Sequence, residues 1–344
     1  MTLAQNENIF FTQALPNIQI AVIGDVMLDQ YIWGKAERIS PEAPVPILEI
    51  QEQESRPGGA ANVALNLVAL GVKVQLIGLI GKDTAGEELI DILSLNAIPT
   101  TGLYKTFERP TTTKTRILAT SGPTGPRQLL RLDKENSNPF FCKPFEEFIK
   151  QNILQKQWDA IIIEDYDKGV LNHEIIEWII QYSHNHNIPV LVDPKFRNFF
   201  SYTGCTLFKP NLRELNTALE LRIDKKDIVG LVEAVSLLRT KMPHPYTLVT
   251  LGDNGVLLVN PEMKHLHIAA HLRKIADVSG AGDTVISVMA AAIAAGLSYP
   301  LATQLANLAG GMVCEEAGAV AIDLTRLAQE THRLNLFEWS NVTL

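Results

Sequence analysis

The sequence predicts an α/β fold in which a mostly parallel β-sheet is covered by helices. Short β-prone runs alternate with helical patterns from one end of the 344-residue chain to the other, as in proteins built from β–α units. Most of the β-prone runs are nearly continuous in apolar residues, such as "DAIIIED" at 159–165, which places them in the buried middle of a sheet. A chain of this length can form one large domain of this kind or two smaller ones.

Several segments have the composition of sheet strands. They lie at residues 18–24, 72–78, 159–165, 188–193, 205–210 and 246–252. The segments between them have helical patterns, and several end in Gly or Asn, as helix C-termini do. We expect helices at residues 60–71, 85–96, 144–156, 173–185, 225–240, 283–297 and 300–316.

Two regions interrupt this alternation. Residues 30–57 and 100–133 are β-prone, are punctuated by proline and lack a helical period. We expect them to form a small accessory sheet that projects from the main domain. Because both regions flank the loops that are candidates for ligand binding, this sheet is predicted to act as a lid over a cleft.

The composition favours a small-molecule partner in the cytoplasm. The net charge of -8 argues against nucleic acid or an anionic membrane, since both reward clusters of Lys and Arg. The scattered Cys142, Cys205 and Cys314 fit neither a disulfide framework nor a paired zinc site, which favours a reducing compartment. The longest apolar run, at 285–297, is shorter than the roughly 20 residues that cross a bilayer, and the N-terminus does not resemble a secretory signal.

The segment "DVSGAGDT" at 277–284 combines features of a phosphoryl-transfer site. A helix that begins near Asp283 presents unpaired backbone N–H groups at Gly280, Ala281 and Gly282, and glycine allows a phosphate to approach the backbone closely. The positive end of the helix dipole is expected to keep Asp283 ionised, so that it can accept the proton of an attacking hydroxyl group. The same residues also fit an ordinary turn and helix cap.

A second glycine-rich segment, "RPGGAANVALNLVALG" at 56–71, leads into another predicted helix. Gly58 and Gly59 precede this helix, and Asn62 lies in its first turn, where backbone donors and a side-chain amide can meet polar ligand atoms. A glycine turn that serves only close helix packing fits the segment about equally well.

Together these two segments resemble, in their order and spacing, the two signatures of the ribokinase-like (PfkB) family of carbohydrate kinases. Further matches to motifs of that family are "GDVMLD" at 24–29, "KPNLREL" at 209–215 and "VTLGDNGVLLV" at 249–259. The resemblance covers nearly the whole chain. It implies a three-layer α/β/α sandwich with a mostly parallel central sheet and a small β-sheet lid, formed by residues 1–344 as one domain. It also implies an ATP-dependent kinase with a sugar hydroxyl group as acceptor.

The resemblance further implies a role for each residue that matches a family motif. Asp283 is expected to be the catalytic base, with the anion hole at Gly280, Ala281 and Gly282. The residues expected to hold sugar hydroxyl groups are Asp29, Gly58, Gly59 and Asn62.

Other matching residues are implied at the ATP site. Asn211 and Glu214 form an N-x-x-E pattern and are implied near the phosphates and the water shell of Mg²⁺, a cation that keeps several waters. Gly252 and Gly255 are implied at the border of the nucleotide, with Asn307 near the adenine. Asp277 and Ser279 resemble the start of a loop that binds a monovalent cation in many members of the family, so K⁺ is a further expected cofactor.

Within the family, "ERISPEAPVP" at 37–46, "TTTKTRIL" at 111–118 and "EDYDKGVL" at 164–171 are most similar to kinases of D-glycero-β-D-manno-heptose 7-phosphate. The implied reaction is phosphorylation of the C1 hydroxyl group to the 1,7-bisphosphate, on the way to ADP-heptose and the lipopolysaccharide core. A phosphorylated acceptor also agrees with basic residues in the lid segments, of which Arg38, Lys114 and Arg116 fall inside these motifs. Any one of these side chains is equally explained as a solvated charge on an exposed strand.

Asp165 and Lys168 follow a predicted strand, at the end where clefts of α/β sheets open, and are expected to line the sugar site. Two other functions stay open: a kinase of another phosphorylated sugar, such as fructose or tagatose phosphate, and a sugar- or nucleotide-sensing protein without turnover. An exposed lid edge favours pairing of two chains, so we expect a homodimer formed through the lid.

Overall fold

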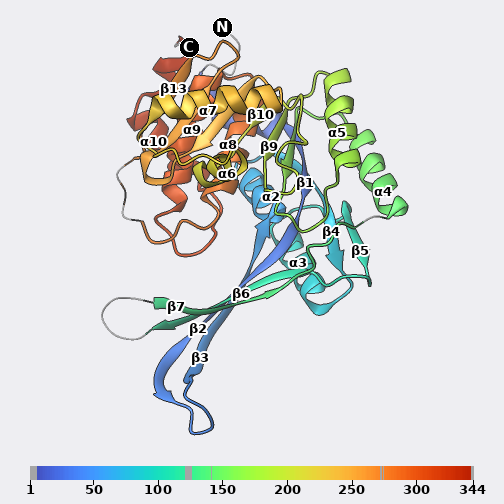
Figure 1. Cartoon of the computed structure of the whole chain (residues 1–344), viewed down its shortest axis with the longest axis vertical. Helices are drawn as coiled ribbons and strands as arrows, with labels where there is room; N and C mark the ends of the chain where they lie inside the picture. The colour runs from blue at the N-terminus through green and yellow to red at the C-terminus, as the bar shows by residue number, and fades with distance from the viewer. Residues whose placement is uncertain (1–5, 121–125, 141, 272, 274, 342–344) are drawn as a thin grey trace.

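A computed structural model describes residues 6–120, 126–140, 142–271, 273 and 275–341 of the chain. Within these residues, nine strands form one large sheet in the order β13-β12-β11-β10-β9-β8-β1-β4-β5 (Figure 1). In chain order they are β1 (Gln19–Gly24), β4 (Lys73–Gly81), β5 (Leu103–Thr106), β8 (Ala160–Glu164), β9 (Val190–Asp193), β10 (Leu207–Phe208), β11 (Tyr246–Thr250), β12 (Val256–Val259) and β13 (His265–Ile268).

The middle of this sheet is parallel. Strand β1 pairs in parallel with β4 on one side and with β8 on the other, and parallel pairing continues through β9 and β10 to β11. Strands β12 and β13 complete that edge in antiparallel pairing. Every residue of β8 and β9 is buried. Their last residues, Glu164 and Asp193, therefore lie at the carboxyl edge of the sheet, where open α/β proteins bind ligands.

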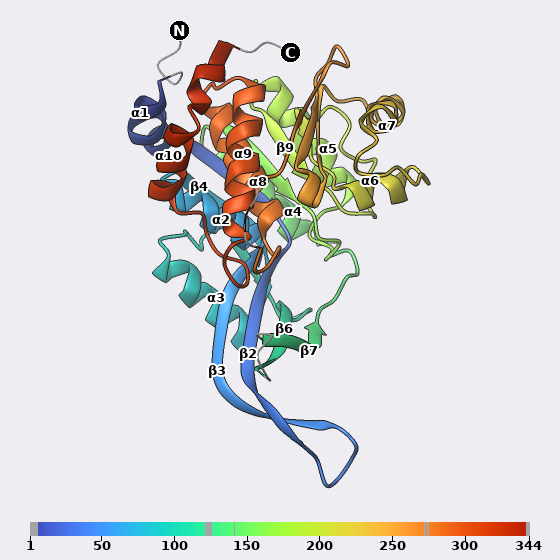
Figure 2. The same ribbon diagram turned by 90° about the vertical axis from the view of Figure 1, so that its left-hand side faces the viewer.

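Helices cover both faces of the large sheet and complete a three-layer α/β/α sandwich (Figures 1 and 2). The core on one face includes side chains of α2 (Ala60–Ala69), α3 (Thr84–Leu95), α8 (Ala281–Ala294), α9 (Tyr299–Val313) and α10 (Leu324–Arg333). The core on the other face includes side chains of α4 (Lys143–Leu154), α5 (His173–Asn185), α6 (Leu212–Ala218) and α7 (Ile228–Lys241). The layered architecture predicted from the sequence is confirmed.

A second sheet projects from the sandwich as a long arm (Figure 2). Its four strands in the described residues follow the order β3-β2-β6-β7. They are β2 (Val26–Ile39), β3 (Pro46–Gly59), β6 (Thr112–Thr120) and β7 (Pro126–Lys134). Strands β2 and β3 form an antiparallel hairpin, and β6 pairs with β2 only as far as Gly34. The end of the hairpin therefore extends beyond the rest of this sheet, which we call the lid.

The predicted lid boundary at residue 100 is wrong. Residues Leu103–Thr106 form β5, which pairs in parallel with β4 at the edge of the large sheet, and the lid resumes only at Thr112. Leu103 is buried against the core of the α2 face. A short β-prone run between proline-containing loops does not reveal which of two sheets it joins, because both offer a free strand edge.

Other differences are small. Helix α8 begins at Ala281, with Gly280 as its N-cap, rather than near Asp283. Helices α6 and α10 and strand β12 were not among the predicted elements. At the N-terminus, the short helix α1 (Glu7–Ile9) and two helical turns at Phe10–Ala14 and Leu15–Asn17 precede β1. A helix long and apolar enough to span a membrane is absent from the described part of the chain.

Candidate active site

Asp283 lies in the first turn of α8, between the two glycine-rich segments. Its side chain is buried, with 4% of the residue exposed. Oδ2 of Asp283 accepts a hydrogen bond from Asn62 Nδ2 at 2.7 Å, and Oδ1 accepts one from the hydroxyl group of Tyr166 at 2.9 Å. The packing of α2 against α8 thus brings together Asn62 and Asp283, which are 221 residues apart in the sequence.

Burial changes the acidity of this carboxyl group. Loss of hydration raises the pKa of Asp283 from 3.8 to about 6, with a further increase from the charge of Asp193. The hydrogen bonds from Asn62 and Tyr166 act in the opposite direction. The predicted effect of the helix dipole is therefore not the dominant one, because burial outweighs it. A pKa of about 6 leaves most of the carboxyl group deprotonated at pH 7 and suits a general base.

The loop before Asp283 is shaped for an anion. Gly280 has a φ of +78°, and a Cβ atom at this position would lie 2.8 Å from Asn62 Nδ2, so only glycine fits without strain. A Cβ atom on Gly282 would lie 3.5 Å from Lys209 Nζ. Lys209 is buried and forms an ion pair with Asp193 at 2.5 Å. A fixed ammonium group therefore stands beside the loop, which suits a transferring phosphoryl group.

A cavity of about 450 Å³ opens beside this loop. The predicted nucleotide residues that line it are Asn211, Gly252, Gly255 and Asn307. Ala281 and Gly282 of the anion loop line the same cavity, so the cavity ends where a phosphate is expected. Its volume is in the range of small-molecule and cofactor sites, and the residues present fit an adenine nucleotide.

Asn211 and Glu214 form a capping box at the start of α6. Asn211 Oδ1 accepts a hydrogen bond from the backbone N–H of Glu214 at 2.8 Å, and Glu214 Oε2 accepts one from the backbone N–H of Asn211 at 2.9 Å. Glu214 Oε1 accepts a third hydrogen bond, from Lys195 Nζ at 2.6 Å. Asn211 lines the nucleotide cavity, whereas Glu214 is buried behind it.

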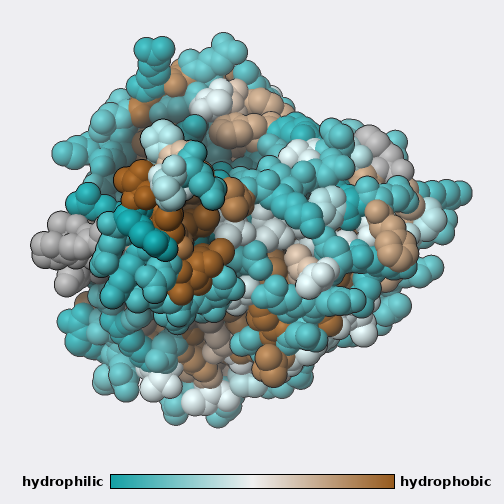
Figure 3. All heavy atoms as spheres, turned by 90° about the horizontal axis from the view of Figure 1, so that it is seen from below, coloured by the Kyte–Doolittle hydropathy of each residue, from teal (hydrophilic) through white to brown (hydrophobic). Residues whose placement is uncertain are grey.

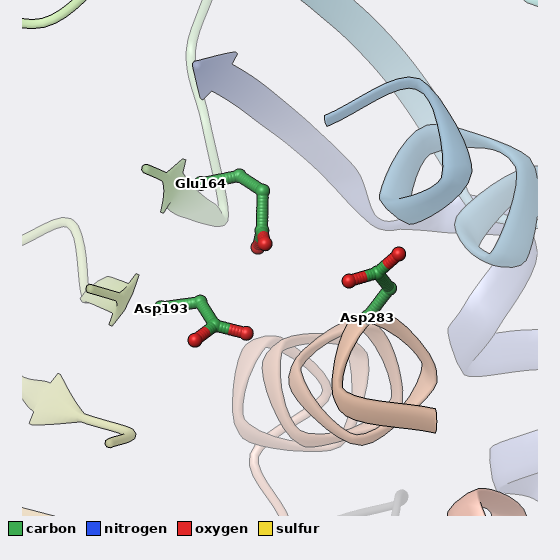
Figure 4. Close-up of side chains that lie close together, drawn as sticks. All are labelled: Glu164, Asp193 and Asp283. Carbon is green, nitrogen blue, oxygen red and sulfur yellow. The ribbon is translucent and has the colours of Figure 1, made fainter. Parts of the chain in front are cut away.

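Three carboxylates meet at the carboxyl edge of the sheet (Figure 4). Glu164, Asp193 and Asp283 each offer an oxygen atom within 4.8 Å of the oxygens of the other two. Burial, followed by the charges of Asp193 and Asp283, raises the pKa of Glu164 well above its ordinary value. Oxygen donors of this kind suit a hard divalent cation such as Mg²⁺. The residues present therefore fit the metal that accompanies ATP, and such a cation would neutralise charge on the phosphates.

The predicted sugar residues lie at the base of the lid. Asp29 on β2 is buried, and its Oδ1 accepts a hydrogen bond from Arg116 Nη1 at 2.8 Å. A Cβ atom on Gly58 would lie 2.8 Å from Asp29 Oδ2, and one on Gly59 would lie 2.5 Å from the carbonyl oxygen of Asp25. Gly58 therefore leaves room beside the Asp29 carboxylate, and Gly59 allows the chain to pass close to the backbone of Asp25.

Two lysines near the base of the lid share one carboxylate, that of Glu135. Lys114 pairs with Asp29 in the register of β2 and β6, and its Nζ is 3.2 Å from Glu135. Lys168 Nζ is 2.9 Å from the same Glu135. We call Lys114, Arg116 and Lys168 the lid cations. Each of them is held by a carboxylate that a phosphate group is able to replace.

Arg38 does not belong to this group. It is exposed and pairs with Ile47 near the end of the hairpin, beyond the part of β2 that pairs with β6. At about 3.3 Å per residue, nine residues of strand place it roughly 30 Å from Asp29. The structure does not bring Arg38 to the other predicted sugar residues, because β2 continues beyond them into the hairpin, so the role of Arg38 in substrate binding stays a prediction.

The base of the lid is also bonded to the loop that follows α9. Arg56 Nη1 donates hydrogen bonds to the carbonyl oxygens of Ala317 at 2.8 Å and Ala319 at 3.2 Å. The hydroxyl group of Tyr31 accepts a hydrogen bond from the backbone N–H of Ala319 at 3.3 Å. These contacts join the sugar side of the site to the C-terminal part of the sandwich.

Asp277 and Ser279, the residues predicted at a monovalent-cation site, stabilise the start of the anion loop through hydrogen bonds. Asp277 Oδ1 accepts hydrogen bonds from Ser279 N and Ser279 Oγ, both at 2.9 Å. Oδ2 of Asp277 accepts one from the backbone N–H of Gly318 at 3.0 Å. Asp277 and Ser279 are thus adjacent to Gly280, and their side chains hold the loop in shape.

Asp165 has a different role from the one predicted. Its carboxylate accepts hydrogen bonds from Asp167 N, Asn198 Nδ2 at 3.0 Å and the hydroxyl group of Tyr202 at 2.6 Å, so it fastens the loop rather than lining the sugar site. The next residue, Tyr166, is the one that reaches Asp283.

Asp25 holds the same loop from the other side. Its Oδ2 accepts hydrogen bonds from the backbone N–H groups of Tyr166 at 2.7 Å and Lys168 at 3.0 Å, and its Oδ1 accepts one from Val170 at 3.2 Å. Asp25 is therefore a positioning residue for the loop that carries Tyr166.

Sequence reasoning missed several residues of this site. They are Asp25, Glu164, Tyr166, Asp193, Lys195 and Lys209. A usable signal was present, since most of them end or directly follow an apolar strand of the parallel sheet, and polar residues at these ends converge on one edge. The motifs "EDYDKGVL" and "VDPK" carry that signal, but only two residues of the first were singled out.

A buried base under a glycine anion loop, with a nucleotide-sized cavity on one side and a polar lid on the other, defines an ATP-dependent carbohydrate kinase. The sequence profile of pfkB family carbohydrate kinases matches residues 17–326. The chain belongs to this family.

Curated relatives agree with this assignment. The chain is 39% identical over 329 residues to the bifunctional protein HldE of Coxiella burnetii, an alignment that covers 92% of the chain and 64% of that protein. It is 40% identical over 319 residues to the bifunctional protein HldE of Pseudomonas paraeruginosa, with coverage of 91% and 64%. The chain thus spans somewhat less than two thirds of the length of these relatives.

Solved structures share the fold. Ribokinase of Arabidopsis thaliana, complexed with ribose and ATP, superimposes with a TM-score of 0.71 at 16% identity, covering 91% of this chain and 99% of that one. Phosphofructokinase-2 of Escherichia coli, in complex with potassium, gives a TM-score of 0.73 at 18% identity, with coverage of 94% and 100%. The predicted ribokinase-like architecture is therefore confirmed.

Proposed function

We propose that this kinase transfers the γ-phosphoryl group of ATP to the C1 hydroxyl group of D-glycero-β-D-manno-heptose 7-phosphate. The hydroxyl oxygen forms the new bond to phosphorus, the bond between the γ-phosphorus and the ADP oxygen breaks, and Asp283 accepts the hydroxyl proton. The products are the heptose 1,7-bisphosphate and ADP. The motifs that resemble heptose 7-phosphate kinases, at 37–46, 111–118 and 164–171, support this acceptor.

The observation that carries the proposal is the set of lid cations beside Asp29. Asp29, Asn62 and the backbone of the glycine pair hold the sugar hydroxyl groups. The 7-phosphate group binds Lys114, Arg116 and Lys168 and takes the place of their present partners, among them Glu135. Phosphate oxygens suit these donors, and Arg116 is able to offer two of them side by side. An unphosphorylated sugar has no group that replaces these carboxylates, so the ion pairs stay intact and the lid cations contribute no binding energy to it.

ATP occupies the cavity beside the anion loop, with Asn307 at the adenine end and Gly252 and Gly255 along its border. Glu214 contributes to the metal site through water, since its two oxygens already accept hydrogen bonds from Lys195 and the backbone of Asn211. Asp277 and Ser279 mark the place of a K⁺ ion. Equal activity in sodium, in potassium and in a large organic cation contradicts the K⁺ site.

The proposal is tested by ADP production with heptose 7-phosphate, fructose phosphates, tagatose phosphate and unphosphorylated sugars. We expect the heptose 7-phosphate to have the highest kcat/KM. Replacement of Lys114 by Met is expected to raise KM for the phosphorylated acceptor at least tenfold, which corresponds to about 1.4 kcal/mol. Lys134→Met is the matched control, because Lys134 is on the same sheet but its side chain is 64% exposed.

Two outcomes contradict the proposal. A preference for a fructose or tagatose phosphate identifies a kinase of another phosphorylated sugar. Binding of ATP and sugar without ADP release from any acceptor identifies a sensing protein of the same fold. In both cases the effect of Lys114→Met on the binding of the phosphorylated ligand still reports on the lid cations.

The lid is also the proposed surface for a second copy of the chain. Exposed apolar side chains lie on its strands and at the end of its hairpin, among them Ile39, Val45, Ile50, Leu130 and Leu132. Figure 3, which views the molecule from the side of the lid, shows apolar patches among the polar side chains. Pairing through this sheet covers them and gives a homodimer. Sedimentation of the wild type as a monomer contradicts this proposal, and Leu130→Asp is expected to weaken the dimer.

A further inference from the structure

Arg109 is a buried arginine in the connection between β5 of the large sheet and β6 of the lid. It is 7% exposed. Its Nη2 donates a hydrogen bond to the carbonyl oxygen of Lys168 at 2.6 Å, whereas Nη1 is buried without a hydrogen-bond partner among the described residues. Burial of a guanidinium group is unfavourable unless nearby charges and hydrogen bonds compensate for it. Arg109 does not line the nucleotide cavity, so nucleotide binding does not explain its burial.

The surroundings of the guanidinium group keep it in one place. Its carbon atom lies 6.0 Å from the centre of the Phe140 ring, and the backbone N–H of Phe140 donates a hydrogen bond to the carbonyl oxygen of Gly169 at 2.9 Å. Loss of hydration lowers the pKa of Arg109, and the charge of Asp25 opposes this change. Because a guanidinium group stays protonated in proteins, Arg109 is a fixed positive charge beside the loop that carries Lys168.

This loop has a backbone that must be held in shape. Asp167 has a φ of +57° and Gly169 has a φ of +83°, and this left-handed region costs free energy for a residue other than glycine. Lys168 lies between them. Its N–H group donates to Asp25 Oδ2 at 3.0 Å, and its carbonyl group accepts the hydrogen bond from Arg109. Both peptide groups that flank the Cα atom of Lys168 are therefore fixed, and the direction of its side chain is fixed with them.

Arg109 also joins the two segments that supply the lid cations. Two of these cations lie on β6, which begins three residues after Arg109, whereas Lys168 follows β8. The start of the β6 segment is itself anchored, because the N–H and hydroxyl groups of Thr111 donate to the carboxylate of Asp83 at 3.2 Å and 2.6 Å. The hydrogen bond from Arg109 to Lys168 is thus a direct link between segments that are 59 residues apart.

We propose that Arg109 is a positioning residue for binding of the acceptor's phosphate group, because it holds Lys168 in register with Lys114 and Arg116. This inference rests on the proposed function, in which the lid cations bind that phosphate. Donors to one phosphate group must be in place together, so a displaced Lys168 lowers the affinity for the phosphorylated acceptor. Arg109 acts through Lys168 and touches neither reactant.

Hydrogen exchange tests the structural part of the proposal without any reactant. Residues 165–171 include three backbone N–H groups that donate to Asp25. In Arg109→Met, deuterium uptake by this segment, measured by mass spectrometry, is expected to be about tenfold faster than in the wild type, because the loop loses one of its two anchors.

Arg239→Met is the matched control. Arg239 is also part-buried and donates hydrogen bonds to the backbone carbonyl oxygens of Val259 and Asn260, both at 2.7 Å, at the end of β12. Its replacement is expected to leave both the exchange of residues 165–171 and the affinity for the acceptor as in the wild type.

Calorimetric titration with heptose 7-phosphate tests the functional part, with inorganic phosphate as a minimal probe of the lid cations. Arg109→Met is expected to weaken binding of heptose 7-phosphate about tenfold, with unchanged affinity for ATP. In a Lys168→Met background the same substitution is expected to weaken this binding by less than about twofold, because the residue through which Arg109 acts is already gone. A general loss of stability does not produce this non-additivity.

A second variant covers the case in which Arg109→Met does not fold. Arg109→Lys keeps a positive charge beside Asp25 but lacks the planar, rigid donor geometry of arginine. We expect Arg109→Lys to fold, to exchange residues 165–171 faster than the wild type and to bind heptose 7-phosphate more weakly.

Three results overturn the proposal: unchanged exchange of residues 165–171 in a folded Arg109 variant, unchanged affinity of that variant for the phosphorylated acceptor, and an equal effect of Arg109→Met with and without Lys168. A wild type that binds neither heptose 7-phosphate nor inorganic phosphate contradicts the role of the lid cations as well. A preference for another phosphorylated sugar in the acceptor panel contradicts the heptose assignment alone, and the same titrations with that sugar then decide the role of Arg109.

Discussion

The hydrogen bond from Tyr166 to Asp283 makes a quantitative prediction about the pH dependence of the reaction. Tyr166→Phe removes the donor that lies 2.9 Å from Asp283 Oδ1 and changes little else in the shape of the side chain. Burial and the charge of Asp283 raise the pKa of Tyr166 well above its ordinary value, so the phenol stays protonated and donates throughout the working range. Loss of this hydrogen bond destabilises the ionised form of Asp283.

The size of the effect follows from the strength of such a bond. A hydrogen bond to a charged group contributes about 1.5–3 kcal/mol, and 1.36 kcal/mol corresponds to one pKa unit. The pKa of Asp283, about 6 in the intact site, is therefore expected to rise by about one to two units. At pH 7 the deprotonated fraction then falls roughly two- to tenfold, and kcat/KM falls with it.

The measurement is the profile of kcat/KM against pH at saturating metal. In Tyr166→Phe the acidic limb is expected to move to higher pH, while the rates of variant and wild type converge above about pH 9. Tyr202→Phe is the control, because Tyr202 is a buried tyrosine that donates to Asp165 at 2.6 Å and not to Asp283. An acidic limb that stays in place or moves to lower pH in Tyr166→Phe, or that moves equally in Tyr202→Phe, refutes the reasoning.

Two further predictions concern the base and a buried histidine. Asp283→Asn is expected to lower kcat about 10²- to 10⁴-fold with little change in ATP affinity measured by calorimetry, and near-normal turnover contradicts the assignment of the base. His244 is buried, and loss of hydration lowers its pKa to about 4. Below pH 6.5 the unfolded chain therefore binds a proton at this residue that the folded chain does not bind. As a result, the free energy of unfolding falls as the pH drops from 6.5 toward 4. His244→Gln keeps a donor for the carbonyl oxygen of Met242 and an acceptor for Thr247; between pH 7 and pH 5 the wild type is expected to lose about 2 kcal/mol more free energy of unfolding than this variant, and equal losses in chemical denaturation contradict the prediction.

The sequence predicted the part of the site that depends on helix starts. Glycine before a helix and a polar residue in its first turn have few structural solutions, so Asn62 and Asp283 could be predicted beside the glycine-rich segments, and the structure brings the two residues together. Their direct hydrogen bond was not foreseen, because it depends on how α2 and α8 pack. Four of the residues predicted at the nucleotide, Asn211, Gly252, Gly255 and Asn307, also line one cavity.

The parts that were missed depend on side-chain direction. Asp165 and Tyr166 are consecutive, yet one faces Tyr202 and the other faces Asp283. This direction is set by hydrogen bonds from the loop to Asp25, which lies 141 residues away from Tyr166. The distance of Arg38 from the other predicted sugar residues was missed for a related reason, because composition identifies a strand of the lid but not how far that strand continues.

The contacts of Arg56 have a consequence for the coupling of the two substrates. Arg56 donates hydrogen bonds to the carbonyl groups of Ala317 and Ala319, which lie on either side of Gly318. The N–H group of Gly318 donates a hydrogen bond to Asp277, which precedes the anion loop in the sequence. The base of the arm and the loop that precedes the anion loop are therefore joined by a continuous chain of hydrogen bonds, so that a displacement of one would displace the other.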